Sequence, residues 1–154
     1  MKVHARGHGR VSAAVVVLLL GGLVGCQRGP EVVTSIVFDG ESRSITTTHA
    51  TCTKQFDGGL VILMQDRPAH TVRIQLSQQG RLVVQKVGLR YEGMHGYVED
   101  PREVTATKVD DTYTFSGRMP PNPGEAQWHT FKIQTTCPTY VDALPPKEPG
   151  MGAP

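Results

Sequence analysis

The chain has 154 residues, of which 16 are basic and 14 acidic. Three of the basic residues lie within the first ten positions, so the rest of the chain carries 13 basic against 14 acidic residues and is close to neutral. A near-neutral chain without a basic cluster gives no electrostatic reason to expect nucleic acid binding, and we set that class aside. The length suits one domain with its own core.

The N-terminus has the order of a secretory signal peptide. Lys2, Arg6 and Arg10 form a basic region, and an uncharged run from Val11 to Val24 follows them. A basic region, an apolar run and a small-residue cleavage site are the three parts of such a signal. The sequence therefore predicts that the protein is exported.

The apolar run closes on a cysteine, and this ending resembles a bacterial lipobox. Its residues are Leu23, Val24, Gly25 and Cys26. In a lipobox the peptidase cuts before the cysteine, which carries a diacylglyceryl group and an N-acyl chain. We therefore expect residues 1–25 to be removed as a lipoprotein signal peptide, lipidated Cys26 to become the new N-terminus, and residues 26–30 to form a short tether at the outer face of the cell membrane. Apart from this covalent lipid, no cofactor is expected.

Two other interpretations of the N-terminus remain open. The run from Val11 to Val24 could be a transmembrane helix, although 14 residues rise only about 21 Å, short of the roughly 30 Å hydrocarbon core. It could also be a plain secretory signal in which Cys26 is incidental. Both alternatives leave the small residues before the cysteine without an explanation.

Two further cysteines, Cys52 and Cys137, are left after Cys26 is assigned to lipid. An exported chain meets an oxidising environment, so the pair predicts one disulfide. The alternatives are two free buried thiols or a pair of metal ligands, but no second ligand pair at zinc-like spacing accompanies them. No metal site is expected.

Short runs rich in β-branched residues follow the tether, separated by Asp, Gly and Pro turn signals. Asp39-Gly40 separates the first two, which are predicted to form a hairpin, and Gly88 inside another suggests a bulge or a close approach. Residues 92–97 and 99–101 have the composition of a loop. The predicted strands are Glu31–Phe38, Ile45–Thr53, Leu60–Met64, Thr71–Ser77, Leu82–Tyr91, Val104–Val109, Thr112–Arg118 and Trp128–Cys137.

These strands predict a single all-β domain, an antiparallel β-sandwich or a related barrel-like sheet, over residues 31–137. In the last strand the parity of Phe131, Ile133 and Thr135 sends Cys137 toward the core, where Cys52 can meet it. Residues 138–154 are rich in proline and lack apolar periodicity, so they are predicted to form a disordered tail.

Signals of catalysis or metal binding are weak. His49, His70, His95 and His129 each stand alone, without the spacing that brings two histidines to one metal. Asp110-Asp111 is typical of a hairpin turn, and general acid/base catalysis needs two carboxyl groups that converge in a pocket. The sequence therefore predicts a protein that is not an enzyme, with an unrecognised envelope enzyme as the remaining alternative.

Trp128 falls on the strand parity opposite to the core residues, and three other large side chains lie in the neighbouring loops. Together they could form a shallow apolar surface for a hydrophobic ligand. The simpler alternative is a lid over one end of the sandwich. The residues concerned are Met94, Tyr97, Met119 and Trp128.

Several short segments, in the same order along the chain, resemble the mycobacterial 19-kilodalton lipoprotein antigen family over most of the mature domain. They are the lipobox, Ile36-Val37-Phe38-Asp39-Gly40, Thr51-Cys52-Thr53, Val87-Gly88-Leu89, Ala106-Thr107-Lys108, Tyr113-Thr114-Phe115-Ser116-Gly117 and Phe131-Lys132-Ile133-Gln134-Thr135-Thr136-Cys137.

The resemblance implies a membrane-anchored cell-envelope antigen with one disulfide-linked β domain, no assigned activity, and a lipid end that host Toll-like receptors sense. It also implies the alternative of a carrier that binds a lipid or other hydrophobic ligand within the domain. The chain departs from the family's best-known member in two respects. Only Gln27–Pro30 stand where that member has a long glycosylated linker, and a proline-rich tail follows Cys137.

Overall fold

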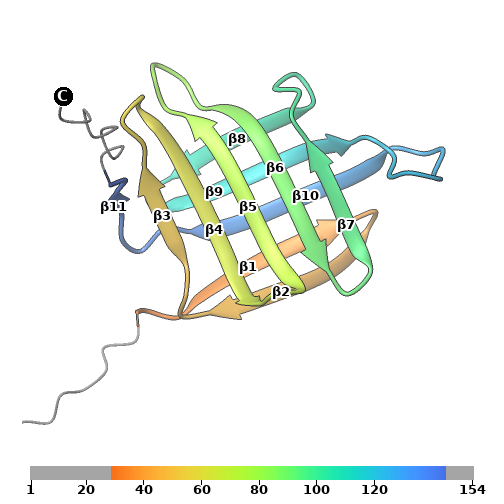
Figure 1. The fold of residues 1–154 in the computed structure, drawn as a ribbon, viewed down its shortest axis with the longest axis horizontal. Coiled ribbons are helices and arrows are strands. Elements are labelled where there is room, and N and C mark those ends of the chain that lie inside the picture. The colour runs from red at the N-terminus through yellow and green to blue at the C-terminus, as the bar shows by residue number, and fades with distance from the viewer. Residues whose placement is uncertain (1–28, 145–154) are drawn as a thin grey trace, which may run out of the picture.

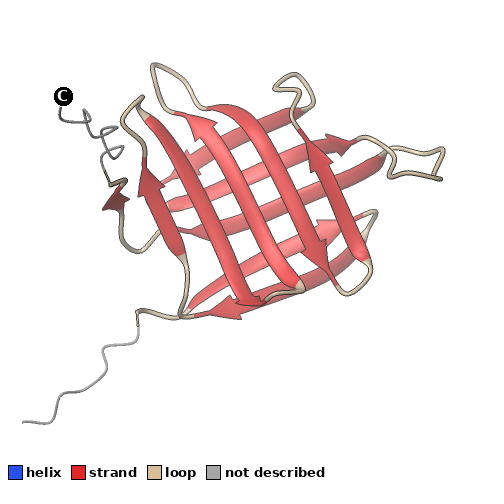
Figure 2. Cartoon of the chain, viewed as in Figure 1, coloured by secondary structure: helices blue, strands red, loops and turns tan. Residues whose placement is uncertain are grey.

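The computed structural model describes residues 29–144. These residues form strands without any helix, in two stacked sheets whose strands cross steeply (Figure 1), and Figure 2 shows the same fold by secondary structure. The five-stranded sheet has the order β2 (Glu41–Thr47), β1 (Val32–Phe38), β10 (His129–Thr136), β9 (Thr112–Met119), β8 (Val104–Val109). The six-stranded sheet has the order β11 (Val141–Asp142), β3 (Thr51–Lys54), β4 (Gly59–Arg67), β5 (His70–Ser77), β6 (Val83–Tyr91), β7 (Met94–Val98). The predicted all-β sandwich is confirmed.

The core lies between the sheets and follows from the alternation of side chains along each strand. In β5 the side chains of Val72, Ile74 and Leu76 are fully buried, while Arg73 points outward. The sheet opposite supplies Tyr113, Phe115 and Ile133, which are also fully buried. Large apolar side chains from both sheets therefore fill the interior.

Two-residue turns connect several neighbouring strands. Asp39-Gly40 joins Phe38 to its partner Glu41, and both turn residues have positive φ, at 48° and 85°. This is the backbone twist that tight hairpins favour. The predicted hairpin of the first two strands is confirmed.

The expectation of a loop over residues 92–97 is wrong. Glu92-Gly93 is a second two-residue turn with positive φ, at 37° and 88°, and it returns the chain into β7. The alternation of β7 is hard to recognise because Gly96 occupies an inward position, where a Cβ atom would lie only 2.5 Å from Sδ of Met119. Close packing, rather than a loop, accounts for that glycine.

The expected single strand over Ile45–Thr53 is also wrong, because the chain changes sheets within it. Thr47 Oγ1 donates a hydrogen bond to the carbonyl oxygen of Gln65 at 2.7 Å and accepts one from the backbone N–H of His49 at 2.9 Å. A side chain that bonds to nearby backbone in this way interrupts a strand. β2 therefore ends at Thr47 in one sheet, and β3 begins at Thr51 in the other.

A disulfide joins Cys52 to Cys137 with a Cα–Cα distance of 5.9 Å, as predicted. Cys52 lies in β3 of the six-stranded sheet and Cys137 follows β10 of the five-stranded sheet, so the bond ties the two sheets together. Both cysteines are buried in the core.

The domain continues beyond residue 137, where the disordered tail was expected to begin. β11 pairs with β3 in parallel, with Val141 opposite Thr53. Just before it, the hydroxyl oxygens of Tyr140 and Tyr113 lie 3.0 Å apart, and the Tyr140 ring lies under the Lys54 ammonium group. Residues 138–144 are thus attached to the sandwich, and the rest of the predicted tail lies outside the described residues.

Within residues 29–144 there is no helix of the length and apolarity that crossing a bilayer requires. The signal peptide, the lipobox and the apolar run before it lie outside the described residues.

Candidate functional site

The outer face of strands β5, β6 and β7 carries a group of polar side chains that line two hollows. Strand alternation turns every second residue of these strands away from the core. Two adjacent cross-strand rows lie on this face: Arg73, Gly88 and Tyr97 in one, and Thr71, Arg90 and His95 in the other.

Gly88 opens a hollow in the first row. The strand irregularity lies elsewhere, at Gln75–Leu76 opposite Lys86 and Val84, and a Cβ atom on Gly88 would meet nothing closer than 3.7 Å. Gly88 therefore marks neither the bulge nor the close approach that the sequence suggested. Gly88 occupies an outward position without a side chain between Arg73 and Tyr97. A hollow of about 460 Å³ lies over it on the Arg90 side, and a second of about 240 Å³ lies on the Lys86 side.

Of the basic side chains around the hollow, Lys86 forms an ion pair within the described domain and the two arginines do not. Lys86 Nζ lies 3.0 Å from Oε1 of Glu99, and the Tyr97 hydroxyl donates to the same oxygen. These hydrogen bonds, first from Tyr97 and then from Lys86, lower the pKa of Glu99, and Glu99 in turn raises the pKa of Lys86. Arg73 and Arg90, in contrast, form no ion pair with any residue from 29 to 144.

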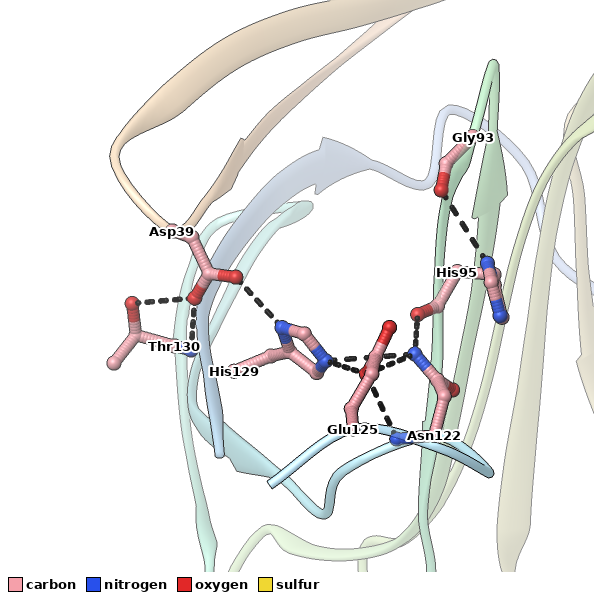
Figure 3. A network of polar contacts seen from close by, with 7 residues as sticks. All are labelled: Asp39, Gly93, His95, Asn122, Glu125, His129 and Thr130. Atoms are coloured by element: carbon pink, nitrogen blue, oxygen red, sulfur yellow. Dashed lines mark hydrogen bonds and ion pairs between the residues drawn. The ribbon is translucent and has the colours of Figure 1, made fainter. Parts of the chain in front are cut away.

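A histidine, His129, lies between two carboxylates (Figure 3). His129 Nδ1 lies 2.6 Å from Oδ2 of Asp39, and Nε2 lies 2.5 Å from Oε2 of Glu125. The ring also stacks on Phe38, with 4.9 Å between centroids. The doubly protonated ring satisfies both contacts, since each nitrogen then donates a hydrogen bond.

The contacts shift the acidities of all three groups toward the charged forms. Hydrogen bonds to Asp39 and then to Glu125 raise the pKa of His129 above its ordinary value of 6.5. Burial alone would raise the pKa of Asp39, but hydrogen bonds from His129 and Thr130 together bring it below 3.8. Hydrogen bonds from His129 and Asn122 lower the pKa of Glu125 below 4.5.

Asn122 links this cluster to the hollow. Its Nδ2 atom donates to the carbonyl oxygen of His95 at 3.0 Å and to Glu125 Oε2 at 3.0 Å (Figure 3). Asn122 also lines the hollow. The loop between β9 and β10 is thereby fixed against β7. Because both nitrogens of His129 face carboxylates, the ring is suited to holding segments together and poorly suited to taking a proton from a ligand.

The sequence-based interpretation of His129 as a lone side chain missed this cluster. Asp39 is 90 positions away and offers no local signal. The spacing of Glu125 and His129, four residues apart, was the one local indication. His70 is likewise not alone, since its Nδ1 lies 3.2 Å from Asp66 and its Nε2 lies 3.3 Å from Glu92.

The four residues of the expected apolar surface do not form one. Met119 is fully buried and packs against Gly96 in the core, because an inward position of β9 carries it. Trp128 is 47% exposed, with the Arg118 guanidinium 5.1 Å above its ring. Tyr97 lies on the outer face of the six-stranded sheet, where it lines the hollow, and Met94 is half-buried against the core. Of the four, Tyr97 alone belongs to the hollow described above.

The described residues contain no group of three His, Cys, Asp or Glu side chains arranged to hold a metal ion. Cys26, the predicted lipidation site, lies outside the described residues, as do Leu23, Val24 and Gly25.

A family model described as Mycobacterium 19 kDa lipoprotein antigen matches residues 28–137. The chain belongs to this family. The match begins two residues after Cys26, covers strands β1 to β10 and includes both disulfide cysteines, so the 19-kDa antigen assignment applies to nearly the whole domain. A search of curated proteins finds no match. Membership in the 19-kDa antigen family makes the chain an envelope-associated lipoprotein, as the sequence predicted.

Proposed function

We propose that the chain is exported, lipidated at Cys26 and anchored to the outer face of the cell membrane, where its β domain acts as a non-catalytic binding module. The observation that carries the anchoring is the match to the lipoprotein antigen family, which begins two residues after Cys26. β1 begins at Val32, six residues after Cys26, and six extended residues span about 20 Å. The domain would therefore lie close to the membrane surface.

Lipid energetics support firm anchoring. Each buried methylene contributes about 0.8 kcal/mol, so a single acyl chain binds reversibly whereas two or three chains hold a protein stably. A diacylglyceryl group together with an N-acyl chain provides that number. The lipid end would also be the part that host Toll-like receptors sense.

The experiment compares wild type with Cys26→Ala in the native host or a close relative. Wild type should incorporate labelled fatty acid and sediment with membranes, whereas Cys26→Ala should lose the label and the membrane association. Purified wild type should activate a Toll-like receptor reporter cell line, and the variant should not. A Cys26→Ala protein that keeps its label and its membrane fraction refutes the anchoring.

The alternative of a carrier with a ligand between the sheets finds less support. The buried side chains of the core cluster come from both sheets and are each at most 7% exposed, and further apolar residues such as Leu82 and Met94 pack partly buried against them, as in a filled core. The hollows described above lie on the outer face of the six-stranded sheet. Native mass spectrometry of the protein from its own host tests the carrier directly, since a co-purified hydrophobic ligand would favour it.

A further inference from the structure

The hollow over Gly88 exists because one position in a row of outward-facing side chains has no side chain. Leu63, Arg73 and Tyr97 occupy the outward positions of three strands in one cross-strand row, and Gly88 leaves the fourth position open. A Cβ atom on Gly88 would meet nothing closer than Cδ2 of Tyr97 at 3.7 Å. The space is therefore available to a ligand, and its volume of about 460 Å³ is within the usual range of small-molecule sites.

The charge lining the hollow is positive. Arg73 and Arg90 project from diagonal positions of β5 and β6, where Cβ atoms lie roughly 7–8 Å apart, so both guanidinium groups can reach one anion. No acidic residue lines either hollow.

Three carboxylates on elements beside this face contact groups other than the two arginines. Glu99 pairs with Lys86, Glu92 with His70, and Glu125 with His129. None of these carboxylates forms an ion pair with Arg73 or Arg90 in the described domain. A local excess of positive charge on a chain whose mature part is near neutral indicates an anionic ligand rather than a general surface property.

The arginines also specify the class of anion. A guanidinium group presents parallel N–H donors that match the oxygens of a phosphate or carboxylate, and Arg is favoured over Lys where such recognition occurs. The Thr71 hydroxyl and the His95 ring add polar groups on the same side, and the exposed Tyr97 ring offers an amphipathic wall. These groups suit the hydroxyls and the ring of a polyol or sugar.

We propose that the hollow over Gly88 binds a polyol or sugar phosphate, with the phosphate between Arg73 and Arg90 and the polyol against Thr71, His95 and Tyr97. Such a group occurs as the headgroup of an anionic lipid and as a soluble sugar phosphate. The site does not depend on lipidation of Cys26, so the anchoring proposal and this one can fail separately.

The test uses the mature chain, residues 26–154, with Cys26→Ala so that no attached lipid contributes. Binding is measured by co-sedimentation with phosphatidylcholine vesicles that contain 20% phosphatidylinositol, a composition chosen here as a probe, and by NMR titration with inositol 1-phosphate. Pure phosphatidylcholine vesicles are the reference. We expect binding to the phosphoinositol vesicles and chemical-shift changes at Arg73, Gly88 and Arg90.

Two variants test the site itself. Arg73→Gln/Arg90→Gln should weaken binding by about tenfold or more, because charge-assisted hydrogen bonds to phosphate are lost. Gly88→Leu should weaken it similarly by filling the hollow while leaving every charge in place. The matched control, Arg43→Gln/Lys132→Gln, removes two positive charges from the other sheet and should change binding by less than about twofold.

Each outcome decides the proposal or the source of the ligand. Vesicle binding together with weak binding of inositol 1-phosphate identifies a lipid headgroup, and comparable binding of both identifies a soluble phosphate. The proposal is overturned if wild type binds neither probe, if Arg73→Gln/Arg90→Gln or a folded Gly88→Leu binds as wild type does, or if the control loses as much binding. Melting temperatures confirm that each variant is folded, and Gly88→Ser replaces Gly88→Leu if the larger side chain prevents folding.

Discussion

The Nδ1 atom of His129 lies 2.6 Å from the Oδ2 atom of Asp39, so a residue at the start of β10 holds the β1–β2 turn 90 positions earlier in the chain. The other ring nitrogen holds Glu125 in the loop before β10. Three segments of the five-stranded sheet therefore depend on one imidazole ring and its charge.

This cluster predicts a pH dependence of stability. The raised pKa of His129 stabilises the fold fully below pH 6.5, its ordinary value, and the stabilisation is lost as pH rises through the higher folded-state value. The lowered pKa values of Asp39 and Glu125 act in the other direction, because their contribution is present above pH 4.5 and lost as pH falls. The cluster should contribute most between about pH 5 and pH 6.5.

His129→Gln should therefore lower the free energy of unfolding by about 1 kcal/mol at pH 6, a modest value because both carboxylates are partly exposed. The difference in unfolding free energy between the variant and wild type should shrink as pH rises toward 8.5. Urea unfolding measured from pH 5.5 to 8.5 follows this difference. His49→Gln, an exposed histidine outside the cluster, is the control and should show no such trend. A difference for His129→Gln that stays constant from pH 5.5 to 8.5 would contradict the role of its charge.

The Cys52–Cys137 bond should contribute strongly to stability because it closes a long loop. With a sequence separation of 85, chain-entropy reasoning gives roughly 4.5 kcal/mol as an upper figure. Cys52→Ala/Cys137→Ala should unfold at a much lower urea concentration, and wild type kept reduced should resemble it. A loss below about 1 kcal/mol would show that the packed sheets hold the domain without the bond.

Two glycines in strands should respond very differently to alanine. A Cβ atom at Gly117 would lie 1.9 Å from the carbonyl oxygen of Glu103, a backbone atom in the neighbouring segment. Gly117→Ala should therefore cost about 3 kcal/mol or more, since backbone must move. Gly88→Ala should be close to neutral, because its nearest contact is 3.7 Å away. Equal melting temperatures for the two variants would be inconsistent with this packing.

The strands could be predicted from local pattern because apolar and polar residues alternate along a strand that is buried on one face. The clean alternation of Thr71–Ser77 gave β5, and the parity of Phe131 and Ile133 placed Cys137 in the core. The change of sheet after Thr47 was not predictable in this way, because it depends on a hydrogen bond to Gln65 on another strand.

Prediction of the site depended still more on how the strands pair, which local sequence does not reveal. Gly88 could be placed on the outer face from the inward parity of Val87 and Leu89, but only strand pairing sets it between Arg73 and Tyr97. Met119 was expected in a loop, because the predicted strand ended at Arg118, whereas the strand continues to Met119 and buries it. Long-range pairing, and not residue type, decides both positions.

Anchoring through Cys26 is tested most directly by the mass of the N-terminal tryptic peptide of the protein purified from the membranes of its own host. Trypsin cuts after Arg28, so the predicted peptide is residues 26–28 with a diacylglyceryl group and an N-acyl chain on Cys26. A peptide that begins elsewhere, or one in which Cys26 carries no lipid, would contradict the proposed anchor.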